Sequence, residues 1–363
     1  MGNVARVKGT LIEYLAREWL LAISILGVTS TSFYLKRWPR LERTDLEVIW
    51  LLAVLFVTVR GLQHSGLMQR LAWRLESGTR VPLKLTLGTF FLSMVVTNDV
   101  ALIAIVPVTL MLQTPYKGWL VILEALAANA GSALTPIGNP QNLFIYWHYH
   151  VSPLSFVREI APFSAVFLVL LVVLAIGIPT ATVASKRMMA PLVNGRTWVH
   201  AGMLLLVIGC VLGLLPLYWT LLVVFNAAIF ERKSLKIDFL LLATFWAFFV
   251  LADNVRIILN GAIKHPDHIF LMTALGSQLV SNVPATLLVS AHTDNWPALL
   301  WGASVGGFGS LMGSLANLIA YRLYIAQGGR GSRRFTWMFL LVGGVAFLLG
   351  VLLYFLVEAP NVR

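Results

Sequence analysis

The chain has 363 residues, of which 58% are apolar and only 12% are charged, and its mean hydropathy is +0.83. Because a soluble globular protein carries about 25% charged residues, this composition excludes one and predicts a protein embedded in a lipid bilayer. The net charge of +12 does not indicate a nucleic-acid partner, since membrane proteins collect Lys and Arg in their cytoplasmic loops. The single cysteine, Cys210, excludes an intrachain disulfide and a cysteine-based metal or redox centre.

Long apolar runs predict that most of the chain forms membrane-spanning helices, since a helix needs about 20 apolar residues to cross the hydrocarbon. The expected spans, in chain order, are 19–35, 46–62, 119–146, 163–180, 199–215, 217–230, 237–259, 299–321 and 336–357. The residues before Trp19 are expected to form an interfacial helix, because no small-residue cleavage site follows them. Two further apolar stretches, 83–112 and 269–290, carry polar breaks near their middles, which predicts re-entrant hairpins.

An internal repeat relates the two halves of the chain. Residues 130–146 read AGSALTPIGNPQNLFIY and residues 305–321 read VGGFGSLMGSLANLIAY, and without a gap they share two Gly, an Asn, a Leu and a Tyr. Each segment follows a broken stretch with an Asn at its break, Asn98 or Asn282. The pattern predicts an all-α polytopic membrane protein with inverted-topology repeats, each containing a re-entrant helical hairpin and a discontinuous transmembrane helix.

The predicted organisation has five parts. They are an N-terminal interfacial helix with the first span (1–44), transport repeat 1 (45–185, with hairpin 83–112 and broken helix 119–146), linking helices and cytoplasmic loops (186–236), transport repeat 2 (237–325, with hairpin 269–290 and broken helix 299–321) and a C-terminal span (326–363).

Polar residues at the predicted breaks are the candidate substrate and ion ligands. Non-helical backbone at membrane depth is stable only against protein or a water-filled cavity, and the helix ends exposed there attract ions. The candidates are Thr97, Asn98, Asp99, Ser132, Thr135, Gly138, Asn139, Asn142, Ser281, Asn282, Val283, Gly307, Ser310, Gly313, Ser314 and Asn317. Asp99 is the only acidic residue between Ser77 and Leu123, and a carboxylate inside a membrane usually marks function. A sodium ion is expected near Asn98, Asp99 and Asn282, or a proton on Asp99, and no other cofactor is expected.

Four motifs in order, TND (97–99), GSALTPIGNPQN (131–142), SNVPATLL (281–288) and GSLANLIAY (313–321), resemble the ion transporter superfamily. This group includes divalent-anion/sodium symporters, citrate transporters, arsenite permeases and some sodium/proton antiporters. The resemblance implies a hairpin-tip triplet at Thr97 to Asp99 and at Ser281 to Val283, and it implies homodimers with an elevator-type motion. Because the third positions lack the Thr of the dicarboxylate members, Asp99 and the GNPQN segment look closer to the arsenite-permease branch.

These features predict a secondary active transporter of a small anion or oxyanion, of the carboxylate or arsenite type, coupled to Na⁺, H⁺ or the membrane potential. An alternative is a sodium/proton antiporter that uses Asp99, and a channel or an intramembrane enzyme is a weaker alternative. The chain has no Walker-type nucleotide motif, so any ATPase would be a partner protein. The one GxSxG sequence, residues 302–306, lies in an apolar helical run without the turn that exposes a nucleophile, so no enzyme is expected.

The basic residues predict the orientation in a plasma (cell inner) membrane. With both hairpins re-entrant, 17 Lys and Arg fall on one side and 8 on the other, which places the N-terminus in the cytoplasm. The segment from Lys36 to Arg43 carries four basic residues on the opposite side, so its location does not follow the rule.

Overall fold

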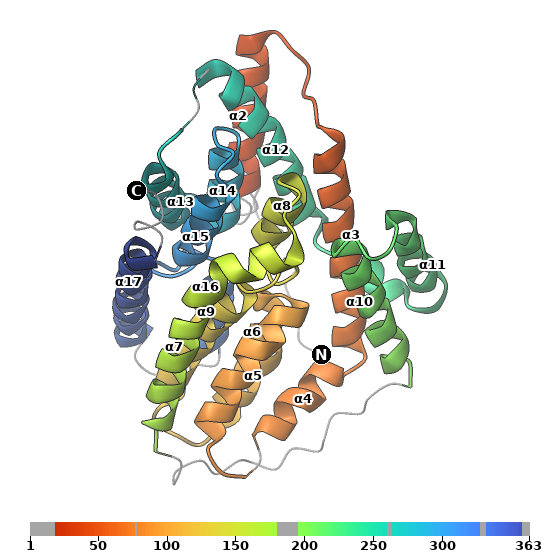
Figure 1. Ribbon diagram of the computed structural model, residues 1–363. Coiled ribbons are helices and arrows are strands. Elements are labelled where there is room, and N and C mark those ends of the chain that lie inside the picture. The colour runs from red at the N-terminus through yellow and green to blue at the C-terminus, as the bar shows by residue number, and fades with distance from the viewer. Residues whose placement is uncertain are drawn as a thin grey trace, which may run out of the picture.

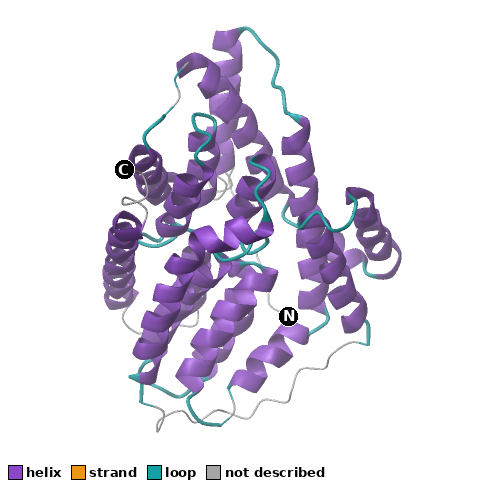
Figure 2. Cartoon of the chain, in the orientation of Figure 1, coloured by secondary structure: helices purple, strands orange, loops and turns teal. Residues whose placement is uncertain are grey.

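The computed structural model describes residues 19–76, 78–179, 195–259, 261, 263–326 and 332–357. Within these residues the regular elements are all helices and no strand occurs (Figure 2). This architecture confirms the predicted class, an all-α polytopic membrane protein. The expected N-terminal interfacial helix lies outside the described residues.

The polar breaks separate pairs of helices in both halves of the chain. In the first half α5 (Val81–Val96) meets α6 (Asn98–Met111) at Thr97, and α7 (Lys117–Ser132) is separated from α8 (Pro140–His148) by residues 133–139. In the second half α13 (Pro266–Val280) meets α14 (Asn282–Ser290) at Ser281, and α15 (Trp296–Gly306) is separated from α16 (Leu315–Ala326) by residues 307–314. Figure 1 shows α5, α6 and α7 in the lower half of the molecule and α13, α14 and α15 in the upper half.

The remaining helices surround these broken elements. They are α2 (Trp19–Leu35), α3 (Arg43–His64), α4 (Leu67–Leu75), α9 (Pro153–Ile176), α10 (Thr197–Val211), the 3₁₀ turn η1 (Leu217–Thr220), α11 (Leu221–Phe230), the 3₁₀ turn η2 (Arg232–Leu235), α12 (Phe239–Leu259) and α17 (Ser332–Val357). Among the described residues, three stretches are long and apolar enough to cross a membrane as single helices: Pro153–Ile176, Arg232–Leu259 and Arg333–Val357.

Two predicted spans, 199–215 and 217–230, form a pair of short helices. α10 has 15 residues and α11 has 10, and both are shorter than the roughly 20 residues of a full crossing. The guanidinium of Arg196, which precedes α10, donates to the carbonyl of Phe230, the last residue of α11. The start of α10 and the end of α11 therefore lie on one face of the protein. The basic residues before α10 and after α11 then lie on the same side of the membrane, as the count of basic residues assumed.

Close packing between hairpins and broken helices depends on glycine. A Cβ atom added to Gly131 on α7 would lie 2.1 Å from the carbonyl oxygen of Phe90 on α5. In the second half a Cβ atom on Gly306 of α15 would lie 2.3 Å from Ser277 Oγ on α13. The backbones of each pair approach as closely as small-residue packing allows, so these two glycines have a packing role.

The outer helices present apolar side chains that no other described residue covers. On α17, Leu341, Leu348, Leu352 and Leu356 are each at least 55% exposed and recur at helical spacing on one face. An exposed apolar stripe of this length is the surface that a helix presents to lipid. The buried face of α17 is aromatic, with Phe335, Phe339 and Tyr354 at most 3% exposed and the Tyr354 ring stacked on Phe270 at a ring distance of 3.8 Å.

Candidate substrate and ion site

Each hairpin tip holds one residue in a backbone conformation that normally requires glycine. Thr97 has φ 101° and ψ 150°, and Ser281 has φ 75° and ψ 155°. A non-glycine residue in this region costs about 1–3 kcal/mol and persists only where its surroundings enforce it. The two strained residues occupy the same place in their hairpins, which marks both tips as functional candidates.

One Asn side chain in each half holds the non-helical backbone between the helices. Asn142 Nδ2 donates to the carbonyls of Thr135 and Ser132, both at 3.0 Å. Asn317 Nδ2 donates to the carbonyls seven and ten residues before it, at 3.0 and 2.9 Å, the same spacing as in the first half. Both Asn were predicted as ligands, but their amide nitrogens are fully engaged in fixing the backbone.

Each hairpin tip is joined to the neighbouring break through a matched backbone bond. The Asn98 N–H donates to the Gly138 carbonyl at 3.2 Å, and the Asn282 N–H donates to the Gly313 carbonyl at 3.0 Å. A Cβ atom on Gly138 would lie 2.1 Å from the Ser132 carbonyl oxygen, so this position has no room for a side chain. The repeat seen in the sequence therefore recurs in the contacts.

Two hydroxyl groups predicted as ligands anchor the breaks to the hairpins. Thr135 Oγ1 donates to the Met94 carbonyl on α5 at 2.6 Å, and Ser310 Oγ donates to the Gln278 carbonyl on α13 at 3.4 Å. The side chain of Gln278 also accepts from the Ser310 N–H at 2.8 Å. Gln278 was not predicted, because a single Gln in a helix is an ordinary surface residue.

An amide cluster joins the two halves at the centre of the protein. Asn98 Nδ2 donates to Asn129 Oδ1 at 3.1 Å and lies 3.4 Å from Ser314 Oγ. Asn129 Nδ2 donates in turn to Asn317 Oδ1 at 2.8 Å. All four side chains are at most 7% exposed. The first hairpin tip is thus bonded to the broken helix of the second repeat.

The second hairpin tip reaches the same cluster at Gly307. A Cβ atom on Gly307 would lie 3.4 Å from both Asn282 Nδ2 and Asn129 Oδ1. The absence of a side chain at Gly307 lets these amides from opposite halves approach one another. Asn129 lies between both tips, yet it was not predicted because it belongs to neither copy of the repeated motif. The available signal was a lone amide within the apolar run 119–130.

Four helices begin at this cluster, which gives it a positive potential without charged side chains. They are α6, α8, α14 and α16, whose first residues are Asn98, Pro140, Asn282 and Leu315. Helix N-termini carry a partial positive charge and favour anions, and here the first N–H groups of α6 and α14 already donate to the Gly138 and Gly313 carbonyls. No Lys or Arg occurs in residues 85–116, 118–157 or 265–321, and the four helices contain one basic residue of this kind, Arg322 in α16.

Buried oxygen atoms without a partner occur in the first half. Among the described residues, Asn139 Oδ1 and Asn142 Oδ1 are buried and accept no hydrogen bond. Asn139 Nδ2 donates to Ser132 Oγ at 2.8 Å, which fixes the orientation of its amide. At the matching places of the second half, the oxygens of Ser314 and Asn317 already have hydrogen-bond partners. Within the described part of the chain no group of three or more His, Cys, Asp or Glu residues could hold a metal ion.

Asp99 and Val283 follow the tip Asn residues but do not join the cluster. Asp99 Oδ1 accepts from the Thr97 hydroxyl at 2.5 Å, and Val283 is half-buried. Asp99 is also only partly buried and shares one helical stripe of α6 with Ile103 and Met111, which are 41% and 37% exposed. No ion pair to Asp99 occurs among the residues described. A cation bound by Asn98 and Asn282 together with Asp99 is therefore not preformed.

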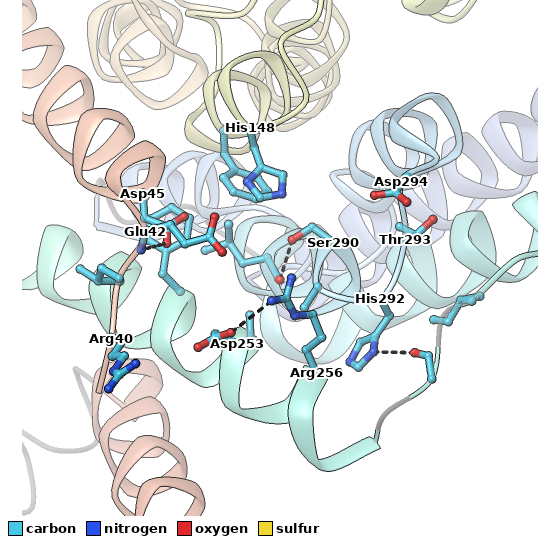
Figure 3. Close-up of a pocket in the computed structure, with 18 of the residues that line it drawn as sticks. Arg40, Glu42, Asp45, His148, Asp253, Arg256, Ser290, His292, Thr293 and Asp294 are labelled. Atoms are coloured by element: carbon cyan, nitrogen blue, oxygen red, sulfur yellow. Dashed lines mark hydrogen bonds and ion pairs between the residues drawn. The ribbon is translucent and has the colours of Figure 1, made fainter. Parts of the chain in front are cut away.

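A cavity of about 950 Å³ lies beyond the outer ends of α8 and α14 (Figure 3). Its walls also include the loop between α2 and α3 and the C-terminal end of α12. The charged residues that line it are Arg37, Arg40, Arg256 and Lys264 together with Glu42, Asp45, Asp253 and Asp294. Phe144 on α8 and Leu287 on α14 also line it, so the cavity borders elements whose inner ends carry the cluster.

Ion pairs in this cavity account for the basic segment that the sequence left unplaced. Arg37 contacts Asp253, and Arg256 lies 3.7 Å from the same carboxylate. Arg40 also lines the cavity, and Arg43 pairs with Glu47 at 3.0 Å. Two of the four positive charges of residues 36–43, those of Arg37 and Arg43, are thus paired with local carboxylates, which weakens this segment as a topology signal.

Comparison with known proteins agrees with this architecture. The citrate transporter family, CitMHS, matches residues 19–301. The chain is 32% identical over 317 residues to the uncharacterized transporter MJ0456 of Methanocaldococcus jannaschii, covering 84% of this chain and 87% of that one. It is 33% identical over 325 residues to the inner membrane protein YbiR of Escherichia coli, covering 84% of each. A shorter match, 34% over 126 residues, covers 32% of this chain and 26% of the silicon efflux transporter LSI3 of Oryza sativa subsp. japonica.

The chain therefore belongs to the citrate transporter family. It is an integral membrane protein and a transporter of the citrate-transporter and anion-permease type. Membership confirms the predicted resemblance to the ion transporter superfamily.

Proposed function

We propose that the protein is a secondary active transporter of a small oxyanion or weakly charged oxyacid, with the amide cluster as its substrate site. The observation that carries this proposal is the meeting of four helix N-termini and buried amides within segments, 85–116, 118–157 and 265–321, that contain no Lys or Arg. Helix N-termini stabilise a negative charge by about 0.3–1 kcal/mol each at exposed sites and more when buried. Without guanidinium or ammonium groups, such a site favours low charge over a di- or tricarboxylate.

Alternating access is supported by the matched contacts of the two halves. Each tip bonds to a break, each break is fixed by one Asn, and the hairpins lie in opposite halves of the molecule in Figure 1. Two similar units of opposite orientation around a midplane site are the architecture of inverted-repeat transporters. Rocking one unit against the other would open the cluster to each side in turn.

Coupling to a sodium ion is supported by the two free amide oxygens of the first half. Asn139 and Asn142 present buried acceptors to the non-helical segment, and small cations prefer oxygen ligands at such breaks. Because the matching oxygens of the second half are occupied, we propose one sodium site and not a symmetric pair.

Counterflow in proteoliposomes tests the transport proposal. Vesicles loaded with unlabelled arsenite or silicic acid should accumulate the labelled compound transiently from outside, whereas citrate and succinate should not exchange. A passive channel would equilibrate without the transient overshoot. Exchange of citrate or succinate in preference to both oxyacids would contradict the proposed substrate class.

A matched pair of variants tests the location. Asn282→Ala should weaken the substrate affinity, and so reduce oxyacid exchange by more than tenfold, because it removes an amide from the cluster. Asn254→Ala removes an equally buried Asn that bonds Thr31 and Ser32 between α12 and α2, and it should leave the substrate affinity unchanged. Equal loss of affinity in both variants would show that the cluster is not the site.

Sodium/proton antiport is a second candidate, favoured by the carboxylate of Asp99 on the uncovered stripe of α6. In this function Asp99 would alternate between a proton and a sodium ion. Asp99→Asn should then abolish sodium-dependent proton release from vesicles while the protein still folds. Full exchange in that variant would remove this candidate.

A further inference from the structure

A second buried carboxylate lies on the same helix as Asn129. Glu124 on α7 is 0% exposed. Its Oε1 atom accepts from the Thr109 hydroxyl on α6, while its Oε2 atom has no hydrogen-bond partner in the part of the chain that is described. An ionised carboxylate that is buried without a partner is strongly unfavourable, and acidic residues inside membranes commonly relay protons.

Within the described part of the chain, no basic group forms an ion pair with Glu124. The helices packed against α7 are α5, α6, α9, α16 and α17, and their charged residues are Lys84, Asp99, Arg158, Glu159, Arg322, Arg333 and Arg334. On α7 itself, the Lys117 ammonium donates to the Leu110 carbonyl at 2.8 Å. None of these groups forms an ion pair with Glu124 among the described residues.

The position of Glu124 couples it to the substrate site through two helices. α6 and α7 are bonded to each other at the cluster, through Asn98 and Asn129, and again through Thr109 and Glu124. Asn129 lies five residues after Glu124, which is about 7.5 Å along the helix axis. A movement of the first hairpin against α7 therefore changes both contacts together.

We propose that Glu124 is a proton-binding coupling site of the transport cycle, an inference that rests on the proposed transport function. In the arrangement of this structure, with the first hairpin packed against α7, the carboxyl of Glu124 is protonated and uncharged and accepts from Thr109. We call this arrangement closed. When the first hairpin moves away, water reaches Glu124, the O–H bond breaks, and the proton passes to that water and leaves a hydrated carboxylate. Reprotonation must then precede closure, because the closed site cannot hold the unpaired charge. In the second half Leu299 takes the equivalent place, so one proton moves per cycle.

Glu124→Gln tests this role because Gln keeps the size of the side chain and can still accept from Thr109. We expect the variant to retain counterflow of unlabelled for labelled substrate, but to lose at least tenfold in accumulation driven by a pH gradient. Its transport rate should also vary less with pH than that of the wild type. Glu159→Gln is the control, since it alters a partly buried carboxylate on α9 that accepts from the Trp301 indole at 3.0 Å, and it should keep gradient-driven accumulation.

Three outcomes would overturn the proposal. These are wild-type gradient-driven accumulation in Glu124→Gln, loss of that accumulation in Asp99→Asn instead, and a wild-type protein that a pH gradient does not drive at all. Failure of wild-type counterflow would instead contradict the transport function itself. Infrared difference spectra provide a readout that does not need transport. A protonated-carboxyl band that changes on adding arsenite should vanish in folded Glu124→Gln, and its persistence would also overturn the proposal.

Discussion

At the scale of single residues, Asn129 is the side chain whose hydrogen bonds join the two halves of the cluster. Its amide nitrogen donates to the carbonyls of Ala125 and Gly307 as well as to Asn317, and its oxygen accepts from Asn98. The sequence marked the tips and breaks because polar residues interrupt apolar runs there. It could not mark Asn129, since a lone amide in a helix does not show which distant backbone it faces.

Asn129→Ala should therefore affect both stability and transport. The change leaves the Asn317 oxygen without its partner and the Asn98 amide with only Ser314 Oγ at 3.4 Å, and an unsatisfied buried group costs about 1–3 kcal/mol. We expect a lower thermal unfolding temperature in detergent and more than tenfold slower exchange. Ser304→Ala is the matched control, because Ser304 occupies the equivalent place on α15 and its buried hydroxyl has no partner among the described residues. Normal transport in Asn129→Ala would contradict the central role of this residue.

At a strained tip residue we expect a substitution that preserves or raises stability, in contrast to the loss expected for Asn129→Ala. Ser281→Gly should leave the unfolding temperature unchanged or raise it, because glycine adopts φ 75° without strain and this gain offsets its greater freedom in the unfolded chain. Ser290→Gly, in the helical conformation of the same hairpin, should lower stability by about 1 kcal/mol. Thermal unfolding of the two purified variants would compare them directly, and equal destabilisation would argue against strain at the tip.

At the scale of elements, the broken hairpins and broken helices were predictable, whereas several partners of their polar residues were not. Asn and Gly in long apolar runs predict breaks because such backbone cannot face lipid. The same residues do not reveal that the Asn142 amide nitrogen fixes the backbone or that the oxygens of Asn139 and Asn142 accept no hydrogen bond among the described residues, because this depends on chain geometry. The short lengths of α10 and α11, 15 and 10 residues, were not predicted, since the apolar run on both sides of Pro216 is long enough to read as two spans.

Helix packing against the first hairpin gives a testable consequence. Gly131→Ala places a methyl group 2.1 Å from the Phe90 carbonyl oxygen, so α5 and α7 must separate, and overpacking of this kind costs about 1–3 kcal/mol. Gly202→Ala on α10 meets no atom within 4 Å and should not destabilise the protein. Thermal unfolding should separate the two variants clearly. A stable, active Gly131→Ala would show that α5 and α7 are not held at this distance.

At the scale of the whole molecule, the charged cavity lies between the solvent and the outer ends of α8 and α14. Removing one positive charge from its wall should lower the local concentration of an anionic substrate, an effect that salt screens. Arg40→Gln should therefore raise the apparent KM about two- to fivefold at low ionic strength for an ionised substrate, and less at high salt. Arg43→Gln is the control, because Arg43 has a 92% exposed side chain and pairs with Glu47. Identical uptake by the two variants would argue against entry through this cavity.

The orientation of the molecule can be decided with two cysteines, because the fold already places two loops on opposite faces. α12 begins at Phe239, six residues after Lys233, and ends at Leu259, and near its C-terminal end Asp253 contacts Arg37 in the loop between α2 and α3. Cys210 is 1% exposed, so Cys210→Ser provides a background without cysteine. On it, Trp38→Cys, at a position 87% exposed, should react with an impermeant maleimide in intact cells. Lys233→Cys should react only after permeabilisation. The reverse pattern would place the N-terminus outside and the charged cavity on the cytoplasmic side. It would mean that the basic residues of segment 36–43, and not the 17 basic residues of the other side, follow the positive-inside rule.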